Sequence, residues 1–168
     1  MKRLIIRWTS LVLAILTAVM IYAFSADTGA ESGQMSGEIT EKVLNTVGIT
    51  EQNTPPQEYA VIKENTHFSI RKLAHFSEYF LLGFFLCVFF CTFSMKRWAA
   101  ALFALAISVL YATLDEWHQS FVPDRGPGAG DVLVDSAGAL FGVLVVMLGA
   151  YVLMKRGRGM QKRTDKKD

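Results

Sequence analysis

The sequence predicts an all-α integral membrane protein, a bundle of four transmembrane helices with a long loop after the first helix. Three observations carry this prediction: four apolar stretches, a low content of charged residues, and an uneven distribution of basic residues along the chain. Of the 168 residues, 52% are hydrophobic and only 19% are charged, whereas soluble domains average about 25% charged residues. A cytosolic enzyme, a disordered chain and a disulfide-stapled secreted module are therefore disfavoured.

The apolar stretches define the expected helices. A transmembrane helix needs about 20 mostly apolar residues, and the chain offers such stretches at about 4–24, 76–93, 98–117 and 131–154. They lack an amphipathic pattern through their middles, as expected for helices that are apolar on all sides. Together they predict one membrane domain over residues 1–154, followed by a basic tail over residues 155–168.

The basic residues predict the orientation of this domain. Twelve of the 17 Lys and Arg lie at the N-terminus, in the short link between the second and third helices, or in the tail. Only Asp165 and Asp168 accompany them as acidic residues. Lys and Arg are enriched in cytoplasmic segments of membrane proteins. Both termini are therefore predicted to be cytoplasmic, and residues 25–70 and 118–130 are predicted to face outward.

Two segments have alternative interpretations. The first apolar stretch could be a cleaved signal peptide, but its run is longer than a typical signal-peptide core, so we expect an uncleaved anchor. The tail could suggest nucleic-acid binding, but a basic run beside a transmembrane helix more often contacts anionic lipid. We therefore expect membrane lipids as partners and no nucleic acid. The oligomeric state stays open.

The outer loop over residues 25–70 is too long for a simple connector. Ile39, Val43, Leu44 and Val47 recur on one helical face, and Gly48 follows as a plausible stop. Two interpretations remain open: a partly ordered cap over the outer membrane face, or a mobile, acidic, solvated loop.

Polar residues gather at the outer ends of the last three helices. Ionisable groups inside a membrane cost about 2.5–3.5 kcal/mol each at the bilayer centre and less near an interface, so their concentration at one depth indicates a functional pocket. The residues predicted to form it are His75, Glu78, Asp115, Glu116, His118, Gln119, Arg125, Asp131 and Asp135.

The fourth helix adds a geometric clue. Asp131, Asp135, Gly138 and Gly142 share one stripe, and the Gly-x-x-x-Gly step allows another helix to approach closely. We therefore expect Gly138 and Gly142 to pack against a neighbouring helix and both carboxylates to face the protein interior. Asp131 could equally serve only as the N-cap of its helix.

Three short motifs resemble the VanZ-like family of bacterial membrane proteins. The first is Arg71-Lys72-Leu73-Ala74-His75-Phe76-Ser77-Glu78-Tyr79, and the second is Asp115-Glu116-Trp117-His118-Gln119-Ser120-Phe121-Val122-Pro123 with Arg125. The third combines Asp131 and Asp135 with Gly138 and Gly142. Asp124 departs from the Gly that the family often has after this Pro. The resemblance implies a multi-pass protein of the bacterial inner membrane, and the name-giving member is linked to resistance to teicoplanin, a lipid-tailed glycopeptide.

Two functions compete for the predicted pocket. The first is a non-enzymatic envelope protein that binds a lipid-linked cell-wall precursor or a glycopeptide antibiotic at the outer leaflet. The alternative is an intramembrane enzyme in which His75, Glu78, Asp131 and Asp135 hold a divalent metal that acts on a lipid-linked phosphate. The sequence has neither His-Glu-x-x-His nor a serine-nucleophile motif, so the first is favoured. A proton-coupled transporter is disfavoured because four helices without an inverted repeat are few for a carrier.

Overall fold

The computed structural model describes the backbone of residues 1–126 and 128–164, and the side chains up to residue 156. Within this part, the chain forms five α-helices and no strand: α1 (Lys2–Ala26), α2 (Gly29–Thr46), α3 (Pro56–Cys91), α4 (Arg97–Gln119) and α5 (Ala129–Thr164). All except α2 are long and apolar enough to cross a membrane. The prediction of an all-α protein with four membrane spans is therefore confirmed.

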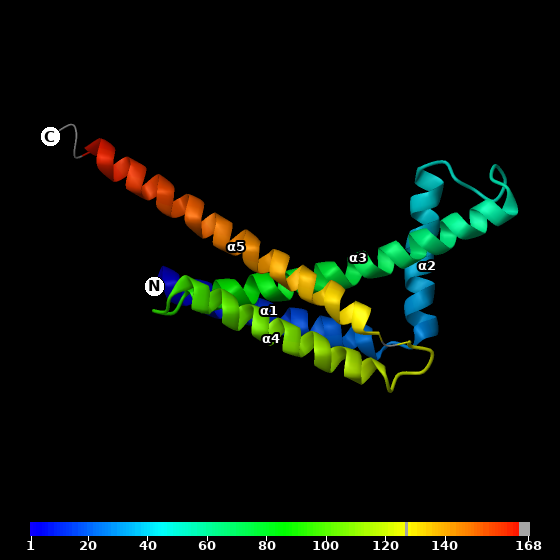
Figure 1. Ribbon diagram of the computed structural model, residues 1–168, viewed down its shortest axis with the longest axis horizontal. Helices are drawn as coiled ribbons and strands as arrows, with labels where there is room; N and C mark the ends of the chain where they lie inside the picture. The colour runs from blue at the N-terminus through cyan, green and yellow to red at the C-terminus, as the bar shows by residue number, and fades with distance from the viewer. Residues whose placement is uncertain (127, 165–168) are drawn as a thin grey trace.

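The spanning helices form a bundle in which α3 packs against α1, α4 and α5. Figure 1 shows the N-terminus, the α3–α4 link and the far end of α5 at one end of this bundle. The other end, here termed the α2 end, carries α2, the α4–α5 loop and the projecting first part of α3. The basic segments predicted to be cytoplasmic thus share one end. That this end faces the cytoplasm stays a prediction.

The segment over residues 25–70, whose order the sequence leaves open, is mostly helical. It contains α2 and the beginning of α3, which starts at Pro56 and not near residue 76. The apolar stretch indicates only the part of α3 that can lie in lipid. The helix itself extends beyond this stretch into water, because the preceding polar residues also adopt helical geometry. Pro56 sets the start, because proline suits the first helical turn. Likewise, α5 continues to Thr164 through part of the expected tail, whose last four residues lie outside the described part.

Local signals that define α2 are visible in its sequence. Thr28 caps the helix: its hydroxyl accepts a hydrogen bond from the Glu31 amide at 3.2 Å, and the Glu31 carboxylate accepts one from the Thr28 amide at 3.0 Å. This reciprocal pair is a capping box, and it lowers the pKa of Glu31. At the other end, Gly48 adopts a φ of +79° and turns the chain.

Helix α4 presents small and polar side chains to the bundle and large apolar side chains outward. On α4, the buried stripe facing the other helices consists of Ala100, Ala104, Ser108 and Ala112. Large apolar side chains on the opposite face, such as Leu102, Leu110 and Leu114, are half or more exposed. Small interface residues and an apolar exterior are typical of helices packed within a bilayer. The surface of the bundle therefore fits lipid as its surroundings.

The closest helix pair is α3 with α5. A Cβ atom on Gly138 would lie within 3.0 Å of the Phe76 carbonyl oxygen, and one on Gly142 would lie equally near the Phe80 carbonyl oxygen. Real Cβ atoms essentially never come so close. The two backbones can therefore meet only because these positions are glycine.

Replacing Gly138 or Gly142 by Ala is expected to lower the melting temperature of the protein in detergent. The added methyl group must push α3 and α5 apart, and such overpacking costs roughly 1–3 kcal/mol. The matched control is Gly149→Ala on the same helix, where a Cβ would meet no neighbouring atom within 4 Å. Equal melting temperatures for all three variants and the natural sequence would contradict the close contact.

Candidate functional site

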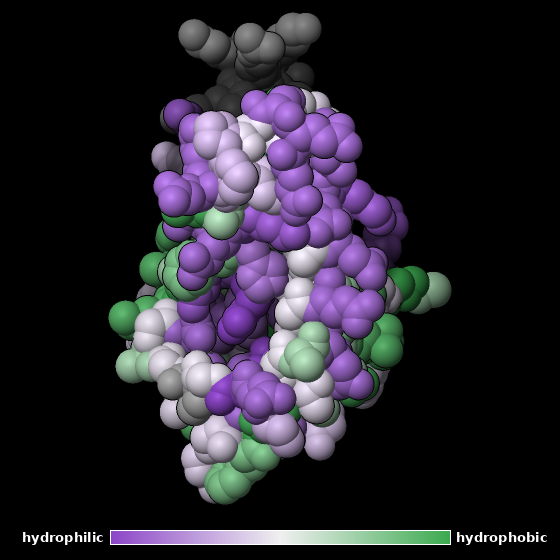
Figure 2. Space-filling model, turned by 90° about the vertical axis from the view of Figure 1, so that its right-hand side faces the viewer, coloured by the Kyte–Doolittle hydropathy of each residue, from purple (hydrophilic) through white to green (hydrophobic). Residues whose placement is uncertain are grey.

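The candidate site lies at the α2 end of the bundle. Figure 2 looks onto this end, and its surface is largely hydrophilic around a central hollow, with apolar surface toward both sides. A cavity of about 170 Å³ opens here. Its walls come from α1, α2, α3, α4 and the α4–α5 loop, so segments far apart in the sequence build it together.

The lining of this cavity combines apolar, charged and hydroxyl side chains. Apolar side chains come from the end of α1, from α2 and from α3: Ile21, Phe24, Met35, Ile39, Ile70 and Ala74. Charged side chains and a histidine come from the α1–α2 link, α3, α4 and the α4–α5 loop: Asp27, Arg71, His75, Glu78, Asp115 and Arg125. Three serines complete it: Ser25, Ser32 and Ser36. The cavity therefore offers both polar and apolar side chains to a ligand.

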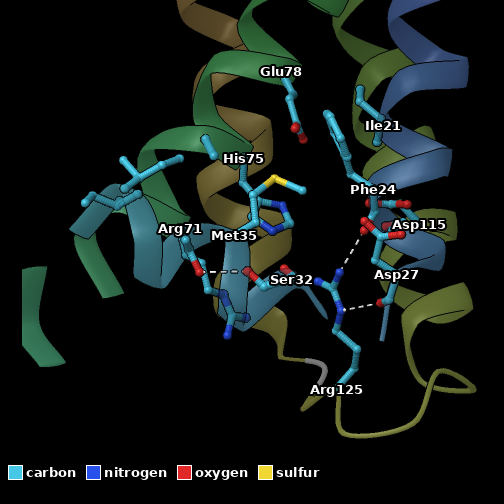
Figure 3. Close-up of a pocket in the computed structure, with 15 residues that line it drawn as sticks. Ile21, Phe24, Asp27, Ser32, Met35, Arg71, His75, Glu78, Asp115 and Arg125 are labelled. Carbon is cyan, nitrogen blue, oxygen red and sulfur yellow. Dashed lines mark hydrogen bonds between the residues drawn. The ribbon is translucent and has the colours of Figure 1, made fainter. Parts of the chain in front are cut away.

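His75 joins the cavity to the buried α3–α5 contact. Figure 3 shows His75, Glu78 and Asp115 around the cavity. Behind His75, its Nδ1 lies 3.6 Å from the Oδ1 of Asp135, which is completely buried between the helices. Within the described part, neither carboxylate oxygen of Asp135 has a hydrogen-bond partner. An ionised carboxylate in such surroundings needs a countercharge, and His75 is the group placed to supply it.

A second pair joins α3 and α5 one turn closer to the α2 end. The Lys72 ammonium contacts the Asp131 carboxylate. Lys72 and His75 lie near one another on α3, and Asp131 and Asp135 are four residues apart on α5. The Lys72–Asp131 and His75–Asp135 pairs therefore connect the same two helices. Neither Asp131 nor Asp135 lines the cavity.

Gln119 connects three elements behind the polar wall. Its amide nitrogen donates a hydrogen bond to the Ser25 hydroxyl at 2.7 Å and another to the Asp115 carboxylate at 3.2 Å. Its carbonyl oxygen accepts one from Arg125 at 3.4 Å. Gln119 and Asp115 are both buried. Since every polar group of Gln119 is used within the protein, its role is to position Asp115 and Arg125.

Arg125 fastens the α4–α5 loop to the end of α1. Its guanidinium donates to the Phe24 carbonyl oxygen at 2.7 Å and to the Asp27 carbonyl oxygen at 3.2 Å, as the dashed lines in Figure 3 show. Burial lowers the pKa of this guanidinium, and nearby Arg71 adds to the effect, but arginine stays charged at physiological pH. Arg125 thus brings a positive charge to the cavity while it closes the loop.

The two remaining predicted residues do not line the cavity. The Glu116 carboxylate accepts a hydrogen bond from the Gly128 amide, just before α5. The His118 ring stacks near Tyr22 of α1, with ring centroids 5.1 Å apart. The structure therefore divides the nine predicted residues into four that line the cavity, His75, Glu78, Asp115 and Arg125, and five that hold its surroundings.

Sequence reasoning missed part of the lining. Arg71 stands in the first motif and lines the cavity, although the predicted pocket does not include it. Met35 and Ile39 come from α2, which the sequence presented as part of a loop of undecided order. The helical spacing of Ile39 and Val43 is visible in the sequence, which left open whether this segment is an ordered cap or a mobile loop.

The donor set for a metal does not assemble. Within the described part, no group of three or more His, Cys, Asp or Glu side chains could hold a metal ion. His75 and Glu78 line the cavity, whereas Asp131 and Asp135 are paired with Lys72 and His75 behind it. The metal hypothesis therefore receives no support from the geometry.

Comparison with known proteins gives one match. The protein family described as VanZ/LLP1 matches residues 10–152. No curated protein and no solved structure matches the chain. The matched range covers α3 and α4, most of α1 and α5, and every residue that lines the cavity.

Replacing Arg125 by Lys is expected to loosen the loop without removing its positive charge, because lysine lacks the planar fork that reaches two carbonyl oxygens. The reporter is the Gly29 amide, which donates to the Pro123 carbonyl oxygen at 3.1 Å beside this contact. Its hydrogen exchange should become faster. Asp124→Asn is the control, since Asp124 is exposed in the same loop and asparagine tolerates its φ of 59°. Unchanged exchange in Arg125→Lys would refute the clamp.

Removing either partner of the His75–Asp135 pair is expected to destabilise the protein by roughly 3–5 kcal/mol. The changes are His75→Gln and Asp135→Asn, and the double variant should lose less than the sum of the two. Reversible unfolding in detergent measures the coupling. The exposed Lys63–Glu41 pair, 2.7 Å apart, is the comparison and should contribute about 0–1 kcal/mol. Additive losses at His75 and Asp135 would show that the two side chains do not interact.

Proposed function

The chain belongs to the VanZ/LLP1 family, and from that premise we propose that it is a non-enzymatic membrane protein of the cell envelope. It binds the polar head of an amphiphile in the cavity at the α2 end. The candidate ligands are lipid-linked cell-wall precursors and lipid-tailed glycopeptides such as teicoplanin. In the second case, the protein lowers susceptibility of the cell to the antibiotic.

The observation that carries this proposal is that charged and apolar side chains line the same cavity. Arg71 and Glu78 both line it, and within the described part neither forms an ion pair or a side-chain hydrogen bond. Charged groups in a partly dehydrated cavity gain from a ligand that replaces water as their partner. A ligand head with acidic and basic or hydroxyl groups fits this pair.

The apolar residues of the cavity lining suit the hydrocarbon tail of the same ligand. Phe24, Met35 and Ile39 line the cavity and are 41%, 49% and 45% exposed. They therefore reach from the cavity to the surroundings of the bundle, where the spanning helices present apolar surface to lipid. A molecule with a polar head and a hydrocarbon tail can contact both the charged and the apolar lining residues while the rest of its tail remains in the bilayer.

Expression of this protein in a teicoplanin-sensitive bacterium should raise the minimal inhibitory concentration of teicoplanin, and Arg71→Gln or Glu78→Gln should remove the effect. Each variant removes a charged partner, and a hydrogen bond to a charged group contributes about 1.5–3 kcal/mol, so binding should weaken about tenfold or more. Glu58→Gln is the control, because Glu58 is exposed on the same helix.

Membrane abundance of each variant is matched by immunoblot, and a glycopeptide without a lipid tail serves as the control compound. Resistance that is equal in all variants would contradict the cavity as the binding site. If the natural sequence gives no resistance, the antibiotic is not the ligand. Lipids that copurify with the natural protein are then compared with those of Arg71→Gln by mass spectrometry, and identical lipid profiles would overturn the binding proposal itself.

A further inference from the structure

Helix α2 has an apolar stripe that the protein itself leaves uncovered. Met35, Ile39, Val43 and Val47 follow one another at intervals of four residues, and they are 49%, 45%, 43% and 63% exposed. The opposite face carries only polar side chains, all exposed: Gln34, Glu38, Glu41 and Asn45. Such an amphipathic helix is typical of segments that lie in the plane of a membrane interface.

A third side of α2 holds it on α3. Ser36, Thr40 and Leu44 are buried, and the Ser36 hydroxyl lies 2.7 Å from Nε2 of His67 on α3. Lys63 of α3 adds an ion pair with Glu41. Because α2 is docked through this side, its apolar stripe is not needed for contact with α3 and remains available for another partner.

The stripe is turned toward the membrane. Figure 1 shows α2 crossing the direction of the spanning helices, so it runs along the plane in which a bilayer would lie. Met35 and Ile39 line the cavity between α2 and the ends of the spanning helices, which fixes the direction of this face. Val43 lies one turn further on the same stripe, and its side of α2 therefore also faces the level of the bilayer.

The depth of α2 also fits an interface. It begins at Gly29, only three residues after α1 ends at Ala26, and the Gly29 amide is bonded to the Pro123 carbonyl oxygen of the α4–α5 loop at 3.1 Å. Trp117 and Phe121, at the end of α4, are 65% and 69% exposed. Exposed aromatic side chains at helix ends are typical of the boundary between hydrocarbon and headgroups.

We propose that α2 lies in the headgroup–hydrocarbon boundary of the leaflet at this end, with Val43 and Val47 immersed in lipid and Met35 and Ile39 over the cavity. The occupant of the stripe is the bilayer, because the stripe continues the apolar surface that the spanning helices already present. One helix is then both a membrane anchor and the wall of the cavity. This inference rests on the arrangement of α2 and does not require any particular ligand.

The test uses a fluorophore attached to single cysteines in proteoliposomes. Val43→Cys and Val47→Cys are compared with Asn45→Cys, a position between them along α2 but on its opposite face, in a background of Cys87→Ala and Cys91→Ala. Nitroxide-labelled phospholipids should quench the fluorophores at 43 and 47 several-fold more than the one at 45. Aqueous iodide should show the reverse order.

Two outcomes would overturn the inference. Iodide quenching at 43 and 47 equal to that at 45 would mean that the stripe faces water. Protection at 43 and 47 from both quenchers would mean that protein covers it, as a second copy of the chain would. If the cysteine-free background does not fold, phospholipids with a photoreactive diazirine are applied to the natural sequence. Adducts should map to Val43 and Val47, and their absence from α2 would equally exclude lipid contact.

Discussion

The backbone contact between α3 and α5 determines the rest of the structure. Because Gly138 and Gly142 carry no side chain, α5 lies directly on the backbone of α3. This approach puts Asp131 against Lys72 and Asp135 against His75. Helix α3 is thereby held at a fixed rotation, which directs Glu78 and Arg71 into the cavity. The glycines and the acidic residues of α5 act together: the glycines allow the close contact with α3, and the carboxylates fix its register.

The polar residues of the site fall into two physical groups. One group satisfies its hydrogen-bonding capacity within the protein, as Gln119 does through Ser25, Asp115 and Arg125. The other group, Arg71 and Glu78, faces the cavity with unused capacity. Buried networks of the first kind can specify helix packing without any ligand. Only the second group, Arg71 and Glu78, therefore supports ligand binding. The sequence shows that polar residues gather at one end of the helices, but it does not distinguish the residues of the first group from those of the second.

The sequence predicted the four spans and the end at which the polar residues gather, because apolar length and charge distribution are properties of single segments. It also predicted the stripe of Asp135 and Gly138, since helical spacing is local. It left open whether residues 25–70 form an ordered cap, because the docking of α2 depends on contacts such as Ser36 with His67, between residues far apart in the chain. For the same reason, the sequence could not show that Glu116 accepts a hydrogen bond from the Gly128 amide and that His118 lies beside Tyr22 of α1, both outside the cavity lining.

The central claim is that an amphiphile binds in the cavity lined by both charged and apolar side chains. Photocrosslinking tests this claim most directly. The probes are teicoplanin and a polyprenyl phosphate, each carrying a photoreactive diazirine close to its polar head, irradiated with the natural protein in membranes. Mass spectrometry of the digested protein then locates the adducts. The account predicts adducts at cavity residues of α1, α2 and α3, such as Phe24, Met35 and Ala74, that excess unlabelled ligand removes. Adducts confined to the outer faces of the spanning helices, unchanged by competitor, would contradict it.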